Sequence, residues 1–199
     1  MVCIFFMKSI DRWIEFFLQE VPKEITITRW EHCLRVAHQA ERLATINGFH
    51  TPKMAFLAGI THDITKQKKK EFHLNLFEHV HDIELDGIPE EAYHAFSAEI
   101  YLATKYGFQN QEIFSAIRSH TLGKVEMSEL DKILYASDFL GSEFAFKQNQ
   151  LEDWVLETEK NLHFGIYLKA SKTINQLLDS KSKIHKSTIE TYNQNLAKL

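Results

Sequence analysis

Glycine, proline and cysteine are scarce in this chain, whose 199 residues include seven Gly, three Pro and two Cys. So few Gly and Pro exclude a fold built from many tight turns and favour a mostly helical protein. Cys3 and Cys33 provide neither a disulfide framework nor a CxxC metal pair. We therefore expect reduced thiols and a cytoplasmic location.

Long apolar runs and a positive net charge are also missing. The apolar start, Val2 to Met7, is too short to cross a membrane, and it lacks the basic segment and the cleavage site of a signal peptide. Met7 is an alternative to Met1 as the first residue. The formal net charge of −4 gives no general footprint for nucleic acid or for an anionic membrane, so we expect neither as a partner.

The chain does contain apolar residues at helical spacing along most of its length. We expect one domain over residues 1–199, with a core over residues 8–178. The polar, Lys-rich residues 180–199 are expected to form a terminal helix or a frayed tail. Caps, stops and spacing predict helices over residues 8–20, 28–47, 53–62, 71–81, 89–106, 110–119 and 128–140, and one or two helices over 151–178.

Local signals mark two of these helix starts. Thr28 with Glu31 three residues later is a capping-box pattern, and Ser128 with Asp131 is a second pair at the same spacing. Eleven His is a high number for one small domain. We expect the His residues in polar, loop-like surroundings to lie at the surface: His73, His79 and His81. His163 is expected to pack or to lie at the surface.

The dipeptide His62-Asp63 stands at the end of a helix that is apolar nearly all round. Such a helix is expected to be central and buried. A His-Asp pair is common by chance, but a buried carboxylate needs a partner or a metal ion. The position of the pair therefore indicates function more strongly than its composition does.

Four more ligand-type residues occur at or near buried helical faces. His94 lies beside a stripe of small residues, and His120 ends the helix over 110–119. Asp138 follows the apolar face of the helix over 128–140, where an unpaired carboxylate would be costly. His32 lies in the first turn of its helix, and alone it is better interpreted as a half-exposed capping-turn residue.

Together these groups exceed the needs of one tetrahedral zinc ion, and they include no Cys. They suit two metal ions that share a bridging Asp63. His32, His62, Asp63 and Asp138 would hold one ion, and His94 and His120 the other. Two such ions stabilise the attacking and leaving oxygens of a phosphoryl displacement, and a bridging water would supply hydroxide. Lys66 would balance charge on the phosphate.

Several segments of the chain also resemble a known family. They are Arg29-x-x-His32 with Arg35-Val36-Ala37, Leu57 to Lys66, His94 with Ser97-Ala98, Ala116 to Gly123, Met127-Ser128, and Lys132 to Asp138. The order His, His-Asp, Asp is similar to that of the HD-domain metal-dependent phosphohydrolases. The His-Thr-x-Gly and Lys-x-x-Tyr-x-x-Asp segments resemble, more closely, the YqeK family of bacterial HD proteins.

This resemblance implies an all-α HD-domain helical bundle and a metal-dependent hydrolase of nucleotide phosphoanhydrides. The expected reaction is symmetrical cleavage of diadenosine tetraphosphate to two ADP. It also implies a dinuclear site that holds two divalent metal ions. Iron is the expected metal, and manganese or another transition metal is the alternative. The metal ligands would be His32, His62, Asp63, His94, His120 and Asp138.

Other residues are assigned to catalysis and to substrate binding. Asp63 and Lys66 are the expected catalytic residues. Thr121 and Gly123 are expected to shape the turn beside His120 and to meet the substrate. Three cations are candidates for phosphate or nucleotide contact, although each is as readily a surface charge: Arg29, Arg118 and Lys132.

One stretch departs from the family pattern. Gly141-Ser142-Glu143-Phe144 stands where the family has a Glu-Pro-Gly-Arg-like stretch, which leaves the nucleotide substrate open. A homodimer is conceivable if four aromatic residues are exposed: Phe5, Phe6, Phe144 and Phe146.

Several alternatives stay open at this point. Another enzyme on the same scaffold would be a nucleotidase, a cyclic-nucleotide phosphodiesterase or a triphosphohydrolase, and a substrate panel separates these. An oxygen-activating di-iron site would show redox-dependent turnover. A nucleotide-binding regulatory module would have lost catalysis. A purely structural bundle would leave the buried His and Asp residues unexplained.

Overall fold

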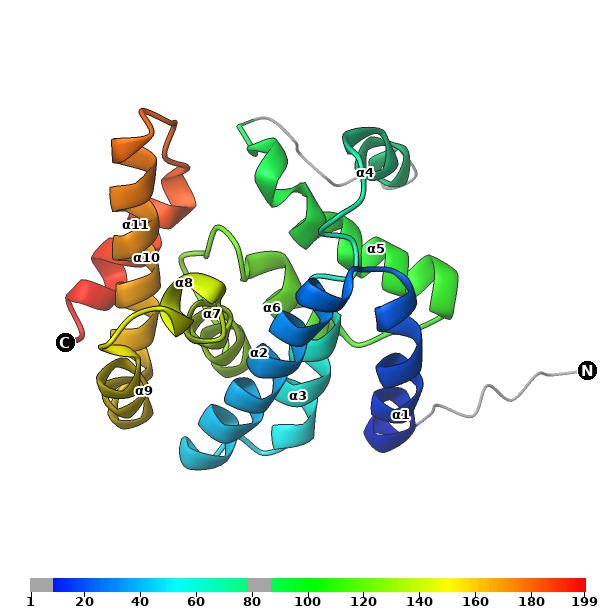
Figure 1. Cartoon of the computed structure of the whole chain (residues 1–199), viewed down its shortest axis with the longest axis horizontal. Helices are drawn as coiled ribbons and strands as arrows, with labels where there is room; N and C mark the ends of the chain where they lie inside the picture. The colour runs from blue at the N-terminus through cyan, green and yellow to red at the C-terminus, as the bar shows by residue number, and fades with distance from the viewer. Residues whose placement is uncertain (1–8, 79–86) are drawn as a thin grey trace, which may run out of the picture.

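The computed structural model describes residues 9–78 and 87–199, which form helices and contain no strand (Figure 1). The predicted all-α fold is therefore confirmed for the described residues. In chain order the elements are α1 (Ile10–Glu20), η1 (Val21–Lys23), α2 (Ile27–Ile46), α3 (Pro52–Thr61), α4 (Lys70–Phe77), η2 (Glu90–Ala92), α5 (Tyr93–Tyr106), α6 (Gln111–Ser119), α7 (Glu129–Leu140), α8 (Glu143–Phe146), α9 (Leu151–Lys160), α10 (Leu162–Asp179) and α11 (Lys186–Leu196).

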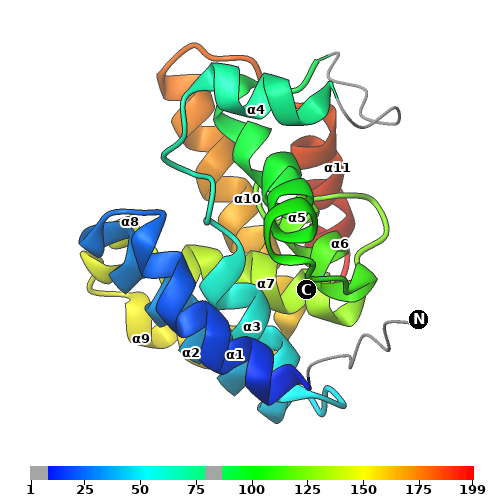
Figure 2. The same ribbon diagram turned by 90° about the vertical axis from the view of Figure 1, so that its right-hand side faces the viewer.

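Helices α2 and α3 lie side by side, as Figure 1 and Figure 2 both show. They approach closely because Gly59 of α3 has no side chain: a Cβ there would lie 2.4 Å from the Cα of Ala37. Residues on all sides of α3 are buried, including Met54, Leu57 and Ile60. The predicted central, buried helix is confirmed, and its end carries His62 and Asp63.

The start of α2 differs from the prediction. Thr26, and not Thr28, is the N-cap, and its Oγ1 accepts a hydrogen bond from the Arg29 N–H at 3.4 Å. The Thr26 N–H in turn donates to Oε1 of Gln67 at 2.7 Å. The capping box at Thr28 and Glu31 is therefore wrong, because a side chain from a distant segment fixes the helix start two residues earlier.

Several other predicted helix ends agree with the structure. Ser128 and Asp131 form the capping box of α7, and Asn110 caps α6. Gly48 and Gly107 follow the ends of α2 and α5 with φ of 70° and 66°, values that favour glycine. These ends depend on neighbouring residues alone, so the sequence is sufficient to place them.

The C-terminal part of the chain forms three helices on one side of the central pair (Figure 1). Asn161 separates α9 from α10 and caps α10, so residues 151–178 contain two helices. Helix α11 packs on α10, and Thr188 donates to the Leu122 carbonyl at 3.1 Å. Of the two alternatives for residues 180–199, the structure shows a packed terminal helix.

Helix α4 differs from the predicted helix over 71–81. It ends at Phe77, and His79 and His81 lie outside the described residues. His73 is 4% exposed, so its predicted surface position is wrong. Its ring packs against α5, where Nδ1 lies 2.7 Å from Ser97 Oγ. The charged neighbours of His73 in the sequence belong to the other face of this short helix.

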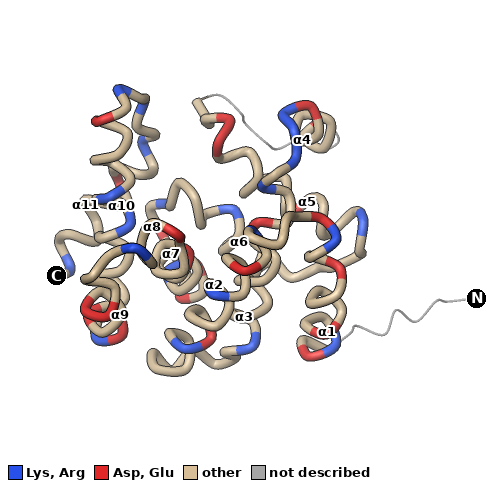
Figure 3. Tube along the Cα trace, in the orientation of Figure 1, with Lys and Arg blue, Asp and Glu red and all other residues tan. Residues whose placement is uncertain are grey.

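Charged residues of both signs are distributed along the described chain (Figure 3). In the described residues, no helix is long and apolar enough to cross a membrane. Cys33 is free and buried, whereas Cys3 lies outside the described residues. Phe144 and Phe146 are 51% and 64% exposed, and Phe5 and Phe6 lie outside the described residues.

Candidate metal centre

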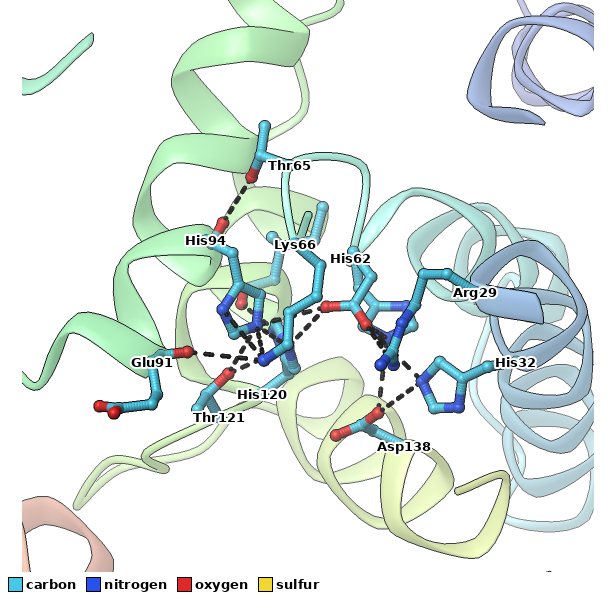
Figure 4. A network of polar contacts seen from close by, with 12 residues as sticks. Arg29, His32, His62, Thr65, Lys66, Glu91, His94, His120, Thr121 and Asp138 are labelled. Atoms are coloured by element: carbon cyan, nitrogen blue, oxygen red, sulfur yellow. Dashed lines mark hydrogen bonds and ion pairs between the residues drawn. The ribbon is translucent and has the colours of Figure 1, made fainter. Parts of the chain in front are cut away.

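The structure brings the six predicted metal-ligand residues together at one place (Figure 4). They come from five places in the helical core: the start of α2, the end of α3 with the turn after it (His62 and Asp63), the start of α5, the end of α6 and the last turns of α7. Five of the residues are at most 6% exposed: His32, His62, Asp63, His94 and His120. The side chain of Asp138 is 20% exposed.

Helix ends explain how neighbouring residues reach the same point. His62 is the C-cap of α3, and Asp63 already belongs to the turn that follows. Neighbours within a helix would point about 100° apart. Because the chain leaves the helix here, both side chains of the pair face the centre. His120 occupies the same C-cap position at the end of α6.

Backbone carbonyl groups orient three of the imidazoles. Nδ1 of His62 lies 2.7 Å from the Gly59 carbonyl, Nδ1 of His120 lies 2.6 Å from that of Ile117, and Nδ1 of His32 lies 3.2 Å from that of Gly141. A carbonyl only accepts, so each Nδ1 carries the proton. Each Nε2 faces the centre, which is the usual arrangement of a metal-ligating histidine.

Asp63 stands between two groups of ligand atoms. Its Oδ2 lies 3.4 Å from Nε2 of His62 and 3.7 Å from Nε2 of His32. Its Oδ1 lies 3.3 Å from Nε2 of His94 and 3.6 Å from Nε2 of His120. One oxygen thus serves each group, and the ligand atoms of each group lie within 4.8 Å of one another.

Asp138 extends the first of these groups. Its Oδ1 lies 3.1 Å from Nε2 of His32 and 3.4 Å from Nε2 of His62. On one side of Asp63, its Oδ2 therefore faces two imidazoles, with the carboxylate of Asp138 beside them. The other side offers the imidazoles of His94 and His120.

The donor set fits two divalent ions. Nε2 of His94 and Nε2 of His120 lie 3.1 Å apart. His62 Nε2 and Asp63 Oδ1 are buried and have no partner with hydrogen-bond geometry among the described residues. Buried polar atoms left in this way cost free energy unless something else binds them. Nitrogen and oxygen donors without sulfur suit iron, manganese and similar borderline ions.

The two carboxyl groups at the centre are ionised although they are largely buried. Burial opposes ionisation of Asp63, but the charge of His62 and the close ring nitrogens of His62 and His120 hold its pKa well below the usual range. Burial likewise opposes ionisation of Asp138, and the Lys169 ammonium outweighs it and lowers that pKa. The two carboxylates are thus charged at neutral pH, which suits cation binding.

The histidines at the centre differ from one another in protonation. Burial lowers the pKa of His94 and of His120, which keeps both rings neutral and available as ligands. Burial also disfavours the charged form of His62, but Asp63 and Asp138 outweigh it and raise the pKa of His62 to about 10. The proton on His62 thus offsets part of the negative charge of the two carboxylates. A bound metal cation would take the place of this proton.

Two polar side chains stand at the edge of the centre in Figure 4. Lys66 Nζ lies 3.4 Å from both ring nitrogens of His94 and 3.5 Å from the Glu91 carbonyl. Thr121 Oγ1 lies 3.1 Å from Nε2 of His94 and 3.1 Å from Nε2 of His120. The structure therefore places both predicted residues beside the second group of ligands.

Arg29 lies on the opposite edge. One of its guanidinium nitrogens donates to Oδ2 of Asp63 at 3.1 Å, and its side chain is 33% exposed. This cation thus contacts the carboxylate that both groups share, and it also borders the solvent. Of the predicted cations, Arg29 and Lys66 are the two beside the centre.

Three predicted substrate residues have their contacts elsewhere. Arg118 is half-exposed and its Nε donates to Glu99 at 2.9 Å, while Lys132 pairs with Glu129 at 3.1 Å. Gly123 forms a turn with φ of 75° and packs against Thr191. Gly123 therefore shapes the turn after His120, as expected, and the roles of all three toward the substrate stay predictions.

Lys169 was not expected at this place. It lies on α10, and its buried Nζ is 2.6 Å from Asp138 Oδ2 and 2.6 Å from the His120 carbonyl. It also lies 4.2 Å from the centre of the Tyr135 ring. The available signal was a lysine inside the apolar stripe of α10, between Leu168 and Ala170.

A second polar chain supports the segment that carries His94. Nδ1 of His73 lies 2.7 Å from Ser97 Oγ, which lies 2.8 Å from Thr65 Oγ1. Thr65 in turn donates to the His94 carbonyl at 3.0 Å. These buried groups join the turn after Asp63 to α5, and so fix the start of α5 against the end of α3.

The stretch that departs from the family pattern contacts the centre mainly through its backbone. The Gly141 carbonyl accepts from His32 at 3.2 Å and from Arg35 Nε at 3.1 Å. Ser142 caps α8, and Glu143 is exposed and pairs with Lys147 at 2.7 Å. The orientation of His32 is therefore kept without the acidic and basic side chains of the family stretch.

The sequence and the fold resemble known HD-domain proteins. The family described as "HD domain" matches residues 29–141, which contain all six predicted metal-ligand residues. A "Bis(5'-nucleosyl)-tetraphosphatase, symmetrical" of Halalkalibacterium halodurans is 30% identical over 178 residues, which are 89% of this chain and 94% of that protein. A protein of the same name from Bacillus subtilis is 29% identical over 175 residues, which are 87% of this chain and 92% of that protein.

The crystal structure of a "predicted HD superfamily hydrolase involved in NAD metabolism" from Clostridium acetobutylicum has the same fold. Its TM-score is 0.82 at 23% identity, over 97% of this chain and 100% of that one.

Proposed function

This chain belongs to the HD-domain family of metal-dependent phosphohydrolases, and on this premise we propose that it cleaves diadenosine tetraphosphate symmetrically into two ADP. One observation carries the proposal: each oxygen of Asp63 faces its own group of histidine nitrogens. This arrangement suits two metal ions side by side. Such a pair stabilises the attacking and the leaving oxygen when a phosphoanhydride is cleaved. The names of the two full-length relatives support the choice of substrate.

We propose that His32, His62, Asp63 and Asp138 hold one ion, and that Asp63, His94 and His120 hold the other. Iron is the proposed metal, and the all-nitrogen-and-oxygen donor set supports it or manganese. What the ions supply when bound is polarisation of the phosphate oxygens and a water of lowered pKa. The remaining chemistry depends on the side chains of this chain.

The proposed reaction adds one water to the central phosphoanhydride. The water oxygen bonds to one of the two inner phosphorus atoms, the P–O bond from that phosphorus to the bridging oxygen breaks, and two ADP and two protons leave. Lys66 and Arg29 approach the centre from opposite edges, where they balance the charge of the four phosphates. The Thr121 hydroxyl lies where it can donate to a phosphate oxygen.

The test is turnover of diadenosine tetraphosphate by the whole, metal-loaded protein. Anaerobically purified, iron-loaded protein is incubated with diadenosine tetraphosphate, and the products are separated by chromatography beside an Asp63→Ala control. ADP alone, lost in the control, is the expected result. ATP plus AMP would overturn the symmetrical cleavage but keep a hydrolase. No turnover with metal bound would overturn the substrate and move the proposal to a different nucleotide.

We also propose that the protein works in the cytoplasm, where a free thiol such as Cys33 stays reduced. Its proposed partner is a small dinucleoside polyphosphate or nucleotide. The absence of a nucleic-acid partner and the homodimer both stay predictions. Size-exclusion chromatography coupled to light scattering would test the second.

A further inference from the structure

A cavity of about 660 Å³ adjoins the metal centre on the side of α8 and α10. Asp138 and Lys169 belong to its lining, so one end of it reaches the first group of ligands. Its volume lies in the usual range of sites for small molecules. We propose that this cavity binds one nucleoside diphosphate half of the substrate, with its phosphates toward Asp138. This inference rests on the proposed function, because that function supplies the substrate class.

The inner wall of the cavity carries a free cation. Lys169 is committed to Asp138 and to the His120 carbonyl. Lys172 follows one helical turn later on α10 and also lines the cavity. Over residues 9–78 and 87–199, no carboxylate lies within ion-pair distance of Lys172, and its Nζ lies 5.3 Å from the centre of the Trp154 ring. Because it makes no ion pair with the described residues, this ammonium is available for a phosphate bound in the cavity.

Negative charge lies at the far end of the same wall. Asp179 is seven residues beyond Lys172 on α10. Seven helical residues span about 10 Å, so this carboxylate does not cancel the charge of Lys172. The wall that α10 forms thus carries its cations, Lys169 and Lys172, toward the end with Asp138, and its own carboxylate at the far end, which matches phosphates inward and a base outward.

The outer part of the cavity offers an aromatic ring and two amides. Phe144 of α8 is 51% exposed, and its ring lies 6.1 Å from that of Phe139. Nucleobases stack on exposed aromatic rings. Asn175 and Gln176 face the same cavity and are exposed. Side-chain amides of this type pair with the N6 and N7 atoms of adenine.

A second cavity on the other side of α8 is a weaker candidate. It measures about 440 Å³, and its lining includes Arg29, Arg35 and Phe146. Phe146 follows Phe144 by two residues, so the two rings point about 200° apart on the helix. The Arg35 guanidinium already lies 5.4 Å from the centre of the Phe146 ring. A base would have to displace this cation to stack on Phe146, whereas the Phe144 ring is open.

The test measures binding rather than turnover. ADP and inorganic pyrophosphate are titrated separately into the metal-loaded protein by isothermal calorimetry. Phe144→Ala should weaken ADP binding about tenfold, in line with the loss of one stacked base, and leave pyrophosphate binding within twofold. Lys172→Ala should weaken both ligands. Phe146→Ala is the matched control, an exposed Phe of the same helix, and should change ADP binding by less than twofold.

Three outcomes would overturn this inference. They are a weaker ADP affinity in Phe146→Ala but not in Phe144→Ala, equal loss of ADP and pyrophosphate in Phe144→Ala, and no change in any variant. Failure of the proposed function would look different. If the protein does not cleave diadenosine tetraphosphate but shows the expected ADP pattern, the subsite stands and the reaction is wrong. If it cleaves the substrate and the variants bind ADP normally, the reaction stands and the subsite is wrong.

Discussion

Lys169 holds Asp138 from outside the matched HD-domain segment: its ammonium donates to Asp138 Oδ2 at 2.6 Å, and residue 169 lies beyond residues 29–141. The same ammonium donates to the His120 carbonyl at 2.6 Å. One side chain of α10 thus positions residues of both predicted ligand groups. It leaves Oδ1 of Asp138 to face His32 and His62.

We expect Lys169→Met to weaken metal retention and to reduce kcat about 10- to 100-fold, as loss of a partner of a metal ligand usually does. Methionine keeps the length of the side chain, so the effect isolates the charge and the hydrogen bonds. Elemental analysis after dialysis measures the metal, and kinetics measure turnover. Lys172→Met, one turn later and exposed, is the control and should keep its metal content. Wild-type metal retention in Lys169→Met would contradict the positioning role.

Asp63 and His120 should differ in how many ions they control. Asp63 reaches both ligand groups, whereas His120 belongs to one. Asp63→Ala is therefore expected to lose both ions, and His120→Ala to lose one. The measurement is metal stoichiometry by elemental analysis after anaerobic loading, with circular dichroism to show that each variant is folded. Two ions retained by Asp63→Ala would exclude a shared carboxylate.

Most of the metal-centre residues were predictable because burial of a polar group is visible in the sequence, whereas the half-exposed position expected for His32 alone is wrong, since it is 6% exposed. The helix before His62 is apolar all round, so the pair at its end had to be buried, and it is. His120 and Asp138 likewise follow apolar stripes. Their assembly into one centre was inferred from their number, type and expected burial, and the family resemblance supported it, since spacing alone does not say which helix ends meet.

The missed features depend on contacts between distant segments. Gln67 lies 41 residues from Thr26, yet its side chain fixes the start of α2. Lys169 lies 31 residues from Asp138. The burial of His73 comes from Ser97, 24 residues away, and not from its charged neighbours. Local patterns describe a residue and its own helix, and they carry no information about such partners.

Gly59→Ala should destabilise the protein because α2 and α3 touch at this position. A Cβ would lie 2.4 Å from the Cα of Ala37, so one backbone must shift. Overpacking of this kind costs about 2 kcal/mol, which corresponds to a Tm lower by roughly 6 °C in a chain of this size. Differential scanning fluorimetry measures it. Lys53→Ala, an exposed change on the same helix, should leave Tm nearly unchanged, and an equal Tm for both variants would contradict the close packing.

Glu24 should make stability depend on pH. It accepts a hydrogen bond from Lys68 at 2.8 Å and one from Lys105, which joins η1 to the turn after α3 and to α5. Burial raises the pKa of Glu24, but the hydrogen bonds from Lys105 and Lys68 outweigh it and lower that pKa from 4.5 to about 2. A lowered pKa stabilises the folded state above the unfolded pKa, and this contribution is lost as the pH falls.

Glu24→Gln should therefore be less stable than the wild type at pH 7, by about 3 kcal/mol at most, since one pKa unit corresponds to about 1.4 kcal/mol. The difference should stay constant above pH 4.5, the unfolded value, and close as the pH falls toward 2. Urea unfolding at a series of pH values measures it. Glu157→Gln removes a surface pair with Lys160 and should show a small gap at every pH. If the gap for Glu24→Gln stayed the same between pH 7 and pH 3, its origin would be packing, because only a titrating carboxylate loses its contribution with acid.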